Sequence, residues 1–471
     1  MGQETIKTFT IHPTNKFNRP APPSTVSLHG LDLISAPMPI RNHRIFPPLP
    51  AHLKDNATDV IEKLKTSLAE ALELYPPISG TVRANDAGDV YIAMDAENRQ
   101  GTPFTFEEKD TPYAGDNEDL TPRDVMILSP LDSILAVKVT QFSCGTIAVA
   151  ASINHQVTDL RGFVDFLEMW AQLARGEPVD FVRIPEDWSR HPGRFFGSST
   201  AEKSTVPPPG YIVLPAPLTE SPPFVAAGLS RWKFTKSDVE RLKNDLSPSA
   251  FAKDTWISSG DALAALLWGV ISRARVNANV TNTYIFGKPD SEGETQTLAM
   301  AADGRDRSVR GKMSDGKYLG NFNLLFTTIA SSSDLLSLSL ESASRVALAI
   351  RTALNHQLAP EAIAHKISFF EDPRNTKPPG RISWPTDVVM TNWSQADLRG
   401  PKLDLGWGKP ICTTAGGGVY PPGYSRMMQD KSTGDVYVLI TIEPEGSKVL
   451  ESDELLNKYA TSVTVAESPL S

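Results

Sequence analysis

Apolar residues along this chain follow two different periods, and together these periods predict a mixture of helices and strands. Between residues 55 and 74, apolar side chains recur every three or four positions, at Val60, Leu64, Leu68 and Leu72. This spacing places them on one face and predicts a helix with that face buried. Shorter apolar runs predict a strand over residues 40–46 and a hairpin over residues 82–95, with its turn at residues 85–88.

Two β-branched, apolar runs over residues 134–142 and 146–153 predict a pair of neighbouring strands joined by a short turn. The second run leads directly to His155, and Asp159 follows four residues later. The residues after Asp159 predict a helix with an apolar stripe, made of Phe163, Phe166, Leu167, Trp170 and Leu173. An imidazole fixed at the end of a strand can exchange a proton near neutral pH, so we expect chemistry here.

Two stretches follow neither period. Residues 100–125 are charged and are expected to form loops. Residues 186–224 are crowded with prolines, which predicts a long crossover between two domains.

Helix start signals are clear in the second half of the chain. Thr235 and Asp238 have the spacing of a capping box. Ser258 stands just before the alanine- and leucine-rich residues 262–274, which predict a buried helix with its own N-cap. The remaining patterns predict a helix over residues 335–356, a glycine-rich turn over 415–423, and strands over 284–286, 298–302, 322–329, 387–391 and 436–442.

The length of 471 residues suits two domains of roughly 200 residues each. We predict an N-terminal domain over residues 1–185, a proline-rich linker over 186–225 and a C-terminal domain over 226–471. The net charge of −9 argues against a protein that mainly binds nucleic acid, because such proteins neutralise phosphates with Lys and Arg.

Compartment signals are few. The two cysteines, Cys144 and Cys412, exclude a disulfide scaffold and a cysteine-rich zinc site, and they are expected to be free thiols. No stretch reaches the roughly 20 apolar residues that span a membrane, and the N-terminus lacks the apolar run of a secretory signal. We therefore expect a cytoplasmic protein without a membrane partner.

His155 and Asp159 form an HxxxD pair, which by itself is weak evidence because roughly one chain of this kind in three would contain one by chance. A histidine that only satisfies a strand-end carbonyl is an equally good local explanation. The motifs GxSxG, GxxxxGK[ST], HExxH and GxGxxG do not occur. The charged residues 303–307 are by themselves more typical of a solvated loop.

Three segments in order resemble the signatures of the BAHD family of CoA-dependent acyltransferases: residues 155–159 (HQVTD), 303–307 (DGRDR) and 404–408 (DLGWG). Weaker similarities at residues 28–32, 64–80, 258–268, 320–321 and 391–393 extend the match over nearly the whole chain. Asn154 and the residues after Asp159 differ from the usual first motif and are similar to fungal trichothecene acetyltransferases. Leu405 replaces the usual Phe, which is a tolerable change of volume.

The resemblance implies an α/β fold of two chloramphenicol-acetyltransferase-like domains, each a mixed sheet with flanking helices, and an active-site channel at their interface. It implies that His155 is the general base that deprotonates the acceptor. Asp159 would then be structural, and would pair with Arg305 or Arg307 instead of relaying charge to the imidazole.

The resemblance also implies roles for residues of the other motifs. Asp404, Gly406 and Gly408 would be structural and would shape the second domain. Thr391 and Trp393 would line the acceptor pocket or hold the oxyanion, although a core role for Trp393 is as good. Ser258 and Ser259 would lie near CoA, whereas capping of the next helix explains them at least as well.

The implied function is transfer of a short acyl group from acyl-CoA, as co-substrate, to a hydroxyl, or less readily an amine, of a small secondary metabolite. No metal, bound cofactor or nucleic acid partner is implied, and we expect a monomer. Two alternatives stay open: a carrier-protein-dependent condensation or release enzyme, and a family member repurposed for binding or for other chemistry. The acceptor, the acyl chain length and the oligomeric state leave no recognisable pattern in the sequence.

Overall fold

The structure is a computed structural model. It describes residues 5–35, 37–54, 57–95, 100–115, 118–125, 127–130, 132–185, 188–192, 203–217, 227–247, 255–280, 294–307, 318–415 and 420–470. The predicted strand at 284–286 lies outside these residues.

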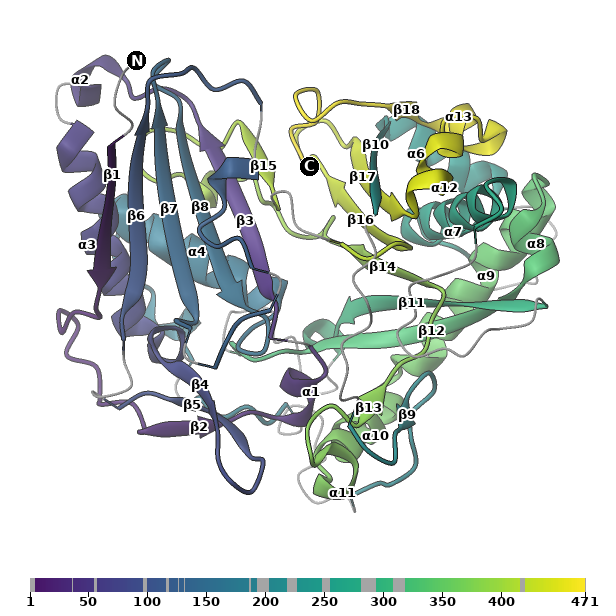
Figure 1. Cartoon of the computed structure of the whole chain (residues 1–471), viewed down its shortest axis with the longest axis horizontal. Helices are drawn as coiled ribbons and strands as arrows, with labels where there is room; N and C mark the ends of the chain where they lie inside the picture. The colour runs from purple at the N-terminus through teal and green to yellow at the C-terminus, as the bar shows by residue number, and fades with distance from the viewer. Residues whose placement is uncertain are drawn as a thin grey trace. The chain divides into compact units, whose positions relative to one another are not determined.

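The chain forms two compact units, both mixtures of helix and sheet (Figure 1). The first unit comprises Met1–Pro192, Gly311–Phe322 and Ala396–Gly418. The second comprises Gly193–Arg310, Asn323–Gln395 and Val419–Ser471. The segment that carries Asp404–Gly408 therefore belongs to the first unit, which corrects our assignment of this motif to the C-terminal domain. The reason is strand pairing, because Cys412–Thr414 joins the edge of the first unit's sheet.

The first unit is built on a six-stranded sheet in the order β1-β6-β7-β8-β3-β15. Its strands are β1 (Thr5–Ile11), β3 (Pro39–Phe46), β6 (Thr102–Lys109), β7 (Leu135–Phe142), β8 (Ile147–Asn154) and β15 (Cys412–Thr414). Only β6 and β7 pair in parallel among these strands. A small second sheet contains β2 (Thr25–Ser27), β4 (Thr81–Ala84) and β5 (Val90–Ala93), and it includes the predicted hairpin.

Strand β6 shows that the predicted loop at residues 100–125 was partly wrong. Phe104 and Phe106 are buried, and polar residues alternate with them, so the segment has the period of a strand. Pairing with β1 on one side and β7 on the other satisfies its backbone.

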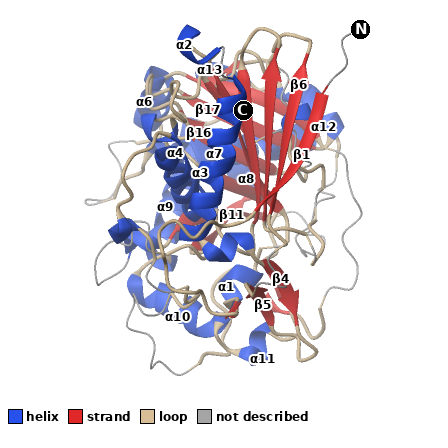
Figure 2. Ribbon diagram, turned by 90° about the vertical axis from the view of Figure 1, so that its left-hand side faces the viewer, coloured by secondary structure: helices blue, strands red, loops and turns tan. Residues whose placement is uncertain are grey.

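Helices α3 (Ala57–Leu74) and α4 (Leu160–Ala174) confirm the two predicted amphipathic helices, and they pack together beside this sheet (Figures 1 and 2). The indole Nε1 of Trp170 on α4 donates to the Leu64 carbonyl of α3 at 3.2 Å and to Ser67 Oγ at 3.1 Å. These hydrogen bonds and the packing of the two buried apolar faces therefore fix how α4 lies against α3. Short elements complete the unit: α1 (Gly30–Leu33), α2 (Ala51–Lys54), η1 (Pro76–Ser79), η2 (Glu118–Leu120), η3 (Phe181–Arg183) and η5 (Pro401–Leu403).

The second unit is built on a seven-stranded sheet in the order β12-β11-β14-β16-β17-β10-β18. Its strands are β10 (Gly228–Phe234), β11 (Thr295–Asp303), β12 (Asn323–Ser331), β14 (Val388–Asn392), β16 (Tyr424–Gln429), β17 (Val436–Ile442) and β18 (Thr461–Ser462). The sequence predicted β11, β12, β14 and β17, but not β10, β16 or β18. A two-stranded ladder of β9 (Ile212–Val213) and β13 (Ile382–Ser383) places a short strand in the segment predicted to have none.

Helices of the second unit are α6 (Lys236–Asp245), α7 (Ser259–Asn277), α8 (Ser332–Leu336), α9 (Leu340–Gln357), α10 (Pro360–Phe370), α11 (Pro373–Thr376), α12 (Pro444–Leu450) and α13 (Glu454–Tyr459), with the short η4 (Arg305–Arg307). Both predicted helix starts are confirmed, because Thr235 caps α6 and Ser258 caps α7 through capping boxes. Residues 335–356 were predicted as one helix but form α8 and α9. The break falls at residues 337–339, where Ser339 caps α9.

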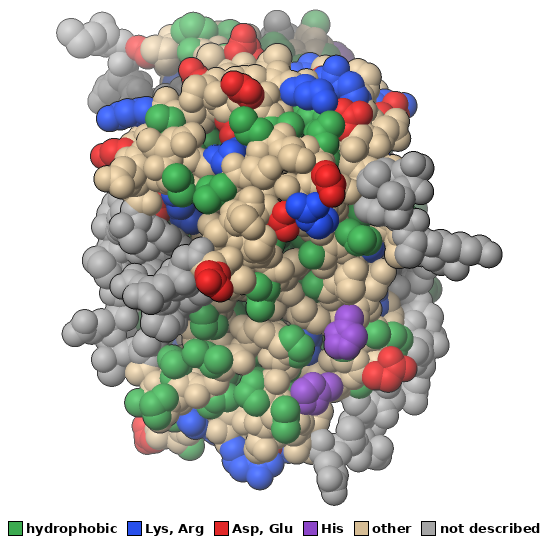
Figure 3. Space-filling model, turned by 90° about the vertical axis from the view of Figure 1, so that its right-hand side faces the viewer, with side chains coloured by type: hydrophobic (Ala, Val, Ile, Leu, Met, Phe, Trp, Pro, Cys, Tyr) green, Lys and Arg blue, Asp and Glu red, His purple; other side chains and the backbone are tan. Residues whose placement is uncertain are grey.

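Within the part of the chain that is described, no helix is both long and apolar enough to cross a membrane. Acidic and basic side chains are interspersed on the face drawn in Figure 3. Cys144 and Cys412 are not joined by a disulfide.

Candidate active site

Strand β8 places His155 one residue beyond its last member, Asn154. The strand is buried at every position, so its end is fixed by core packing. The backbone N–H of His155 donates to the Met38 carbonyl at 2.9 Å. The Asn154 side chain accepts from the N–H of Gln156 at 2.9 Å, and its carbonyl accepts from Val157 at 3.0 Å. These bonds make a tight turn that holds the Cα of His155 in one position.

The side chain of Asn321 faces the imidazole. Its Nδ2 donates to the His155 carbonyl at 2.8 Å and to Asp32 Oδ1 at 3.0 Å. Because both amide hydrogens point at oxygens, the orientation of the amide is fixed and its Oδ1 must be the atom 3.2 Å from His155 Nδ1. An oxygen without hydrogens can only accept, so Nδ1 carries the proton and Nε2 keeps its lone pair.

Asp32 holds Asn321 in this orientation. Its carboxylate accepts five hydrogen bonds: from the N–H of Asn321 and of His29, from Asn321 Nδ2, and from Nε and Nη2 of Arg190. The Arg190 pair is bidentate, with distances of 2.7 and 3.0 Å, and the exposed fractions are 3% for Arg190 and 0% for Asp32. A buried pair with its lone pairs satisfied in this way is a rigid support.

Arg190 also ties this support to the turn after β8. Its Nη2 donates to the Val157 carbonyl at 2.6 Å, and its own carbonyl accepts from the Tyr318 hydroxyl at 3.1 Å. We call His155, Asn321, Asp32 and Arg190 the histidine support. All four residues belong to the first unit.

Burial lowers the pKa of His155 below its ordinary value of 6.5. The charges of Asp159 and Asp32 and the hydrogen bond to Asn321 act in the opposite direction but do not outweigh burial. The imidazole is therefore neutral at pH 7 while the residue stays partly exposed. A neutral ring with a free Nε2 lone pair can accept a proton.

The carboxylate of Asp159 is bonded to backbone amides. Oδ1 accepts from the N–H of Gly162 at 3.1 Å and caps helix α4, and Oδ2 accepts from the N–H of Phe322 at 2.8 Å. The helix start and the segment that carries Asn321 are thus joined through one side chain. Gly162 permits this contact, because a Cβ there would collide with Thr158 Oγ1 and lie 2.7 Å from the Leu319 carbonyl oxygen.

Arg305 and Arg307 form η4 in the second unit. Arg305 is 1% exposed, and its Nη1 donates to Asp303 Oδ1 at 3.0 Å. Residues 303–307 are therefore not simply a solvated loop, because Arg305 is buried. The pairing of Asp159 with either arginine stays a prediction.

The third family motif, residues 404–408 (DLGWG), is a turn that the side chain of Asp404 stabilises. Asp404 Oδ1 accepts from the N–H of Gly406 at 2.7 Å and of Gly408 at 2.9 Å. Both glycines have positive φ, 111° and 125°, which L side chains rarely adopt. Arg175, at the end of α4, donates to the Asp404 carbonyl, so the turn is fastened to the helix that begins at Asp159.

Helix α7 begins beside the end of β14 in the second unit. A Cβ on Gly260 would lie 3.3 Å from Asn392 Nδ2. Ser258 is occupied as the N-cap, since its Oγ accepts from Asp261 N–H and its N–H donates to Asp261. The indole of Trp393 donates to Thr391 Oγ1 at 3.1 Å, and both residues are partly exposed, so Trp393 is not a plain core residue.

The model of the Transferase family matches residues 3–456. The chain belongs to this Transferase family. This membership confirms the resemblance drawn from the BAHD motifs.

Similar proteins agree with this membership. Acyltransferase uat1 of Mycosarcoma maydis is 26% identical over 463 residues, which cover 89% of this chain and 86% of the relative. Hydroxycinnamoyltransferase 2 of Oryza sativa subsp. japonica is 26% identical over 417 residues, which cover 82% of this chain and 84% of the relative. The crystal structure of F. graminearum TRI101 complexed with coenzyme A and T-2 mycotoxin covers 93% of this chain and 100% of its own, with a TM-score of 0.72 and 16% identity. This likeness confirms the predicted two-part α/β fold.

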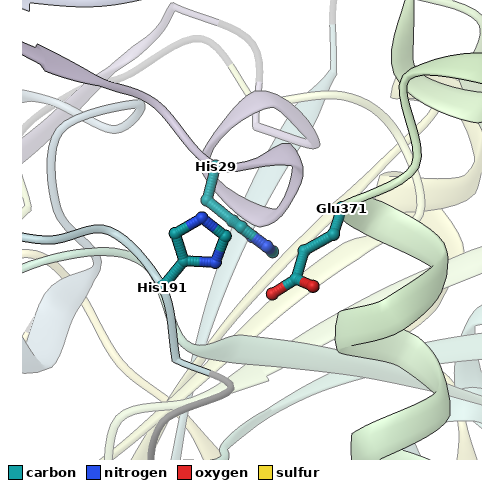
Figure 4. Close-up of side chains that lie close together, drawn as sticks. All are labelled: His29, His191 and Glu371. Carbon is teal, nitrogen blue, oxygen red and sulfur yellow. The ribbon is translucent and has the colours of Figure 1, made fainter. Parts of the chain in front are cut away.

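Three members of the histidine support were not assigned a role from the sequence. Residues 28–32 and 320–321 were noted only because they occur in Transferase family order, and Arg190 was placed in the linker. The one available signal was an aspartate between two leucines, at Leu31-Asp32-Leu33. His29 belongs to the same corner: it caps α1, and its ring lies 5.3 Å from that of His191 at 68° (Figure 4).

Proposed function

We propose that this protein transfers a short acyl group from acyl-CoA to a hydroxyl of a small secondary metabolite, with His155 as general base. The observation that carries the proposal is the neutral imidazole whose Nδ1 faces Asn321 Oδ1 at 3.2 Å. This arrangement leaves Nε2 as the acceptor of a proton. Membership of the Transferase family and the name of the fungal relative, acyltransferase uat1, support the same reaction.

In the proposed reaction, Nε2 of His155 removes the hydroxyl proton as the oxygen attacks the thioester carbonyl. The new C–O bond forms and the carbonyl electrons move onto oxygen. When the tetrahedral intermediate collapses, the C–S bond breaks and the imidazolium returns the proton to the CoA thiolate. A neutral histidine suits both transfers, and such proton transfer contributes about 10²–10⁴-fold to the rate.

The other motif residues support this chemistry indirectly in our proposal. Asp159 anchors the turn that aims His155 and pairs with Arg305 or Arg307. Thr391 and Trp393 line the acceptor pocket, and the Thr391 hydroxyl, which accepts from the Trp393 indole, can donate its own hydrogen to the developing oxyanion. Ser259 lies near CoA, whereas Ser258 is occupied in capping α7.

The TRI101 structures complexed with coenzyme A and with T-2 mycotoxin or deoxynivalenol support CoA as the donor and a small molecule as the acceptor. We propose a hydroxyl over an amine as the acceptor group, as the BAHD resemblance implies. An assay with several acyl-CoA donors measures which acyl group the enzyme transfers.

The test is a mass-spectrometric assay of polyols and phenols with acetyl-, butyryl- and benzoyl-CoA. We expect acylated product from the wild type and a loss of at least about a hundredfold in His155→Ala. His356→Ala removes an exposed histidine of α9 and serves as the matched control, with activity unchanged. Near-wild-type turnover in His155→Ala contradicts the base assignment, and product formed only with an acyl carrier protein supports a condensation enzyme instead.

A further inference from the structure

His29 lies where helix α1 begins, directly beside the histidine support. Its backbone N–H donates to Asp32 Oδ2 at 2.9 Å, and its carbonyl accepts from the N–H of Asp32 at 2.9 Å. Its ring Nδ1 accepts from the N–H of Leu31 at 3.1 Å. The residue whose carboxylate holds Asn321 is therefore bonded twice to the backbone of His29, and the ring closes the turn between them.

The neutral ring of His29 has one defined tautomer. A nitrogen that accepts from a backbone N–H cannot carry a hydrogen, so the hydrogen of this ring is on Nε2. His155 has the opposite arrangement, because its Nδ1 faces an oxygen. On its Nε2 side His29 thus presents a donor and not a lone pair, which is unlike a metal-ligating histidine, whose second N–H donates to an oxygen.

Packing keeps the ring of His29 in place. The residue is 6% exposed. Its ring centre lies 5.3 Å from that of His191 with the planes at 68°, which is an edge-to-face contact (Figure 4). His191 follows Arg190 in the chain, so His29 contacts the segments that carry both partners of the buried ion pair. All of these residues belong to the first unit.

An imidazole is an unusual N-cap. Ser, Thr, Asp and Asn are preferred, because a short side chain brings an oxygen to the first N–H groups of a helix. Thr235 does this at the start of α6 in the second unit, where Asp238 completes the same kind of capping box. Helix α1 has only four residues, and so short a helix is not stable by itself. The place of Asp32 therefore depends strongly on the cap.

We propose that His29 is a positioning residue for the proposed acyl transfer, and that it acts on His155 through Asp32 and Asn321. Loss of the bond to Leu31 frees the start of α1, so the carboxylate of Asp32 shifts. Asn321 then loses the fixed orientation in which its Oδ1 faces His155 Nδ1. The imidazole hydrogen redistributes to Nε2, and fewer molecules keep the lone pair there that the base needs. The inference rests on the proposed function only for its effect on rate.

The tautomer of His155 tests the proposal independently of catalysis. Proton–nitrogen correlation NMR of the full-length protein with ¹⁵N-labelled histidine shows which ring nitrogen carries the hydrogen, and His155→Ala identifies the signals of His155. We expect Nδ1–H in the wild type and a mixture with Nε2–H in His29→Phe, which keeps a ring but has no acceptor. His29→Asn supplies an acceptor at the N-cap and should restore the wild-type spectrum of His155.

Thr235→Ala is the matched control, because it removes the cap of a similar box that has no bond to the histidine support. It should leave the signals of His155 unchanged. If His29→Phe does not fold, His29→Leu removes the acceptor with a smaller side chain and carries the same expectation. A wild-type tautomer of His155 in either folded variant overturns the proposal, as does Nε2–H in the wild type itself.

Kinetics then test the path through Asn321. We expect His29→Phe to lower kcat about two- to tenfold, the range of one neutral hydrogen bond, and to leave the KM for acyl-CoA unchanged. Because both substitutions act on the same bond, the double variant with Asn321→Ala should be no slower than Asn321→Ala alone. Fully additive losses, or a loss that persists in His29→Asn, overturn this path. If the tautomer changes as expected but the wild type consumes no acyl-CoA, the positioning role stands and the proposed function fails.

Discussion

Two buried arginines of the first unit, Arg190 and Arg44, differ in what surrounds their charge. Arg190 forms a bidentate pair with Asp32 and donates to a backbone carbonyl. Arg44, on β3, is 0% exposed, and none of its three guanidinium nitrogens has a hydrogen-bond partner among the described residues. The Cζ of Arg44 lies 5.5 Å from the centre of the Trp170 ring.

The pKa values of the two arginines are shifted in opposite directions. Burial acts to lower the pKa of Arg190, but the charge of Asp32 and its hydrogen bonds outweigh burial and raise it. Burial alone lowers the pKa of Arg44 to about 9. Both residues are buried, but of the two only Arg190 belongs to a described hydrogen-bond network that reaches His155, the proposed base.

The comparison indicates that a buried charged residue serves function when its hydrogen-bond partners connect it to a residue proposed to take part in the chemistry. From Arg190 the bonds lead through Asp32 and Asn321 to His155. Arg44 has no such bonds to the described residues, and its guanidinium only packs near the ring of Trp170 on α4. The predictions below test this distinction, from the largest expected effect to the smallest.

The first prediction breaks the paired site. Asp32→Asn keeps the shape but leaves Arg190 buried without a counter-charge, so we expect a loss of about 3–5 kcal/mol in the free energy of unfolding. Urea denaturation followed by tryptophan fluorescence measures it. Glu177→Gln, in an exposed pair with Arg175, is the control and should cost less than about 1 kcal/mol. A loss below 1 kcal/mol for Asp32→Asn would mean that the pair is not a support.

The second prediction asks whether the network serves rate as well as stability. Asn321→Ala removes the acceptor that fixes the Nδ1–H tautomer of His155. A neutral hydrogen bond is worth about 0.5–1.5 kcal/mol, which corresponds to a fall of about two- to tenfold in kcat. Because the bond to Asn321 raises the pKa of His155, its loss should also move the acid limb of the pH profile to lower pH.

A stability loss in Asn321→Ala without a change in kcat or in the acid limb would leave Asn321 a purely structural residue. Gln357→Ala is the matched control, because among the described residues that buried amide bonds only to the backbone of β12 in the second unit. We expect it to lower stability and to leave the pH profile in place.

The third prediction concerns the second unit, where Ser258 and Asp261 are joined by hydrogen bonds at the start of α7. Asp261 also pairs with Arg351, whose Nε donates at 2.7 Å. Ser258→Ala should cost about 1 kcal/mol of stability through the lost cap and leave the KM for acyl-CoA unchanged. Ser259→Ala, one position on, should cost much less. A tenfold rise in KM for Ser258→Ala with full stability would show a role in CoA binding instead.

The fourth prediction concerns the unpaired site. Arg44→Met removes a charge that no described residue neutralises and keeps an apolar chain against Trp170. We expect the free energy of unfolding to stay within about 1 kcal/mol of wild type or to rise, because replacing buried charge by apolar volume is often neutral or stabilising. Urea denaturation measures the change. A loss of 3 kcal/mol or more would show that Arg44 has a partner as important as Asp32.

The sequence predicted the parts of the site that follow local patterns. The apolar run of β8 located His155, and the stripe after Asp159 located α4, because both depend on neighbours within a few residues. The cap at Ser258 was found for the same reason. Family motifs added the expected roles of Asp159 and Asp404.

The sequence did not predict the histidine support, because its bonds join distant positions. Asn321 is 166 residues from His155 and 289 from Asp32. No periodicity records such pairings, and the short segment around Asn321 has no pattern of its own. Strand β6 was missed for a related reason, since Pro103 and the charges after Phe106 concealed an alternation that only its two neighbouring strands make favourable.

The pH dependence of kcat/KM for acyl transfer tests the central claim, that a neutral His155 with a free Nε2 is the base. The base works only when unprotonated, so activity must fall as pH drops through its pKa. Because burial lowers that pKa, we expect a plateau at about pH 7.5 to 8 and a tenfold fall per pH unit well below an inflection that lies under 6.5. A profile without an acid limb, or with its inflection above 6.5, would contradict the claim.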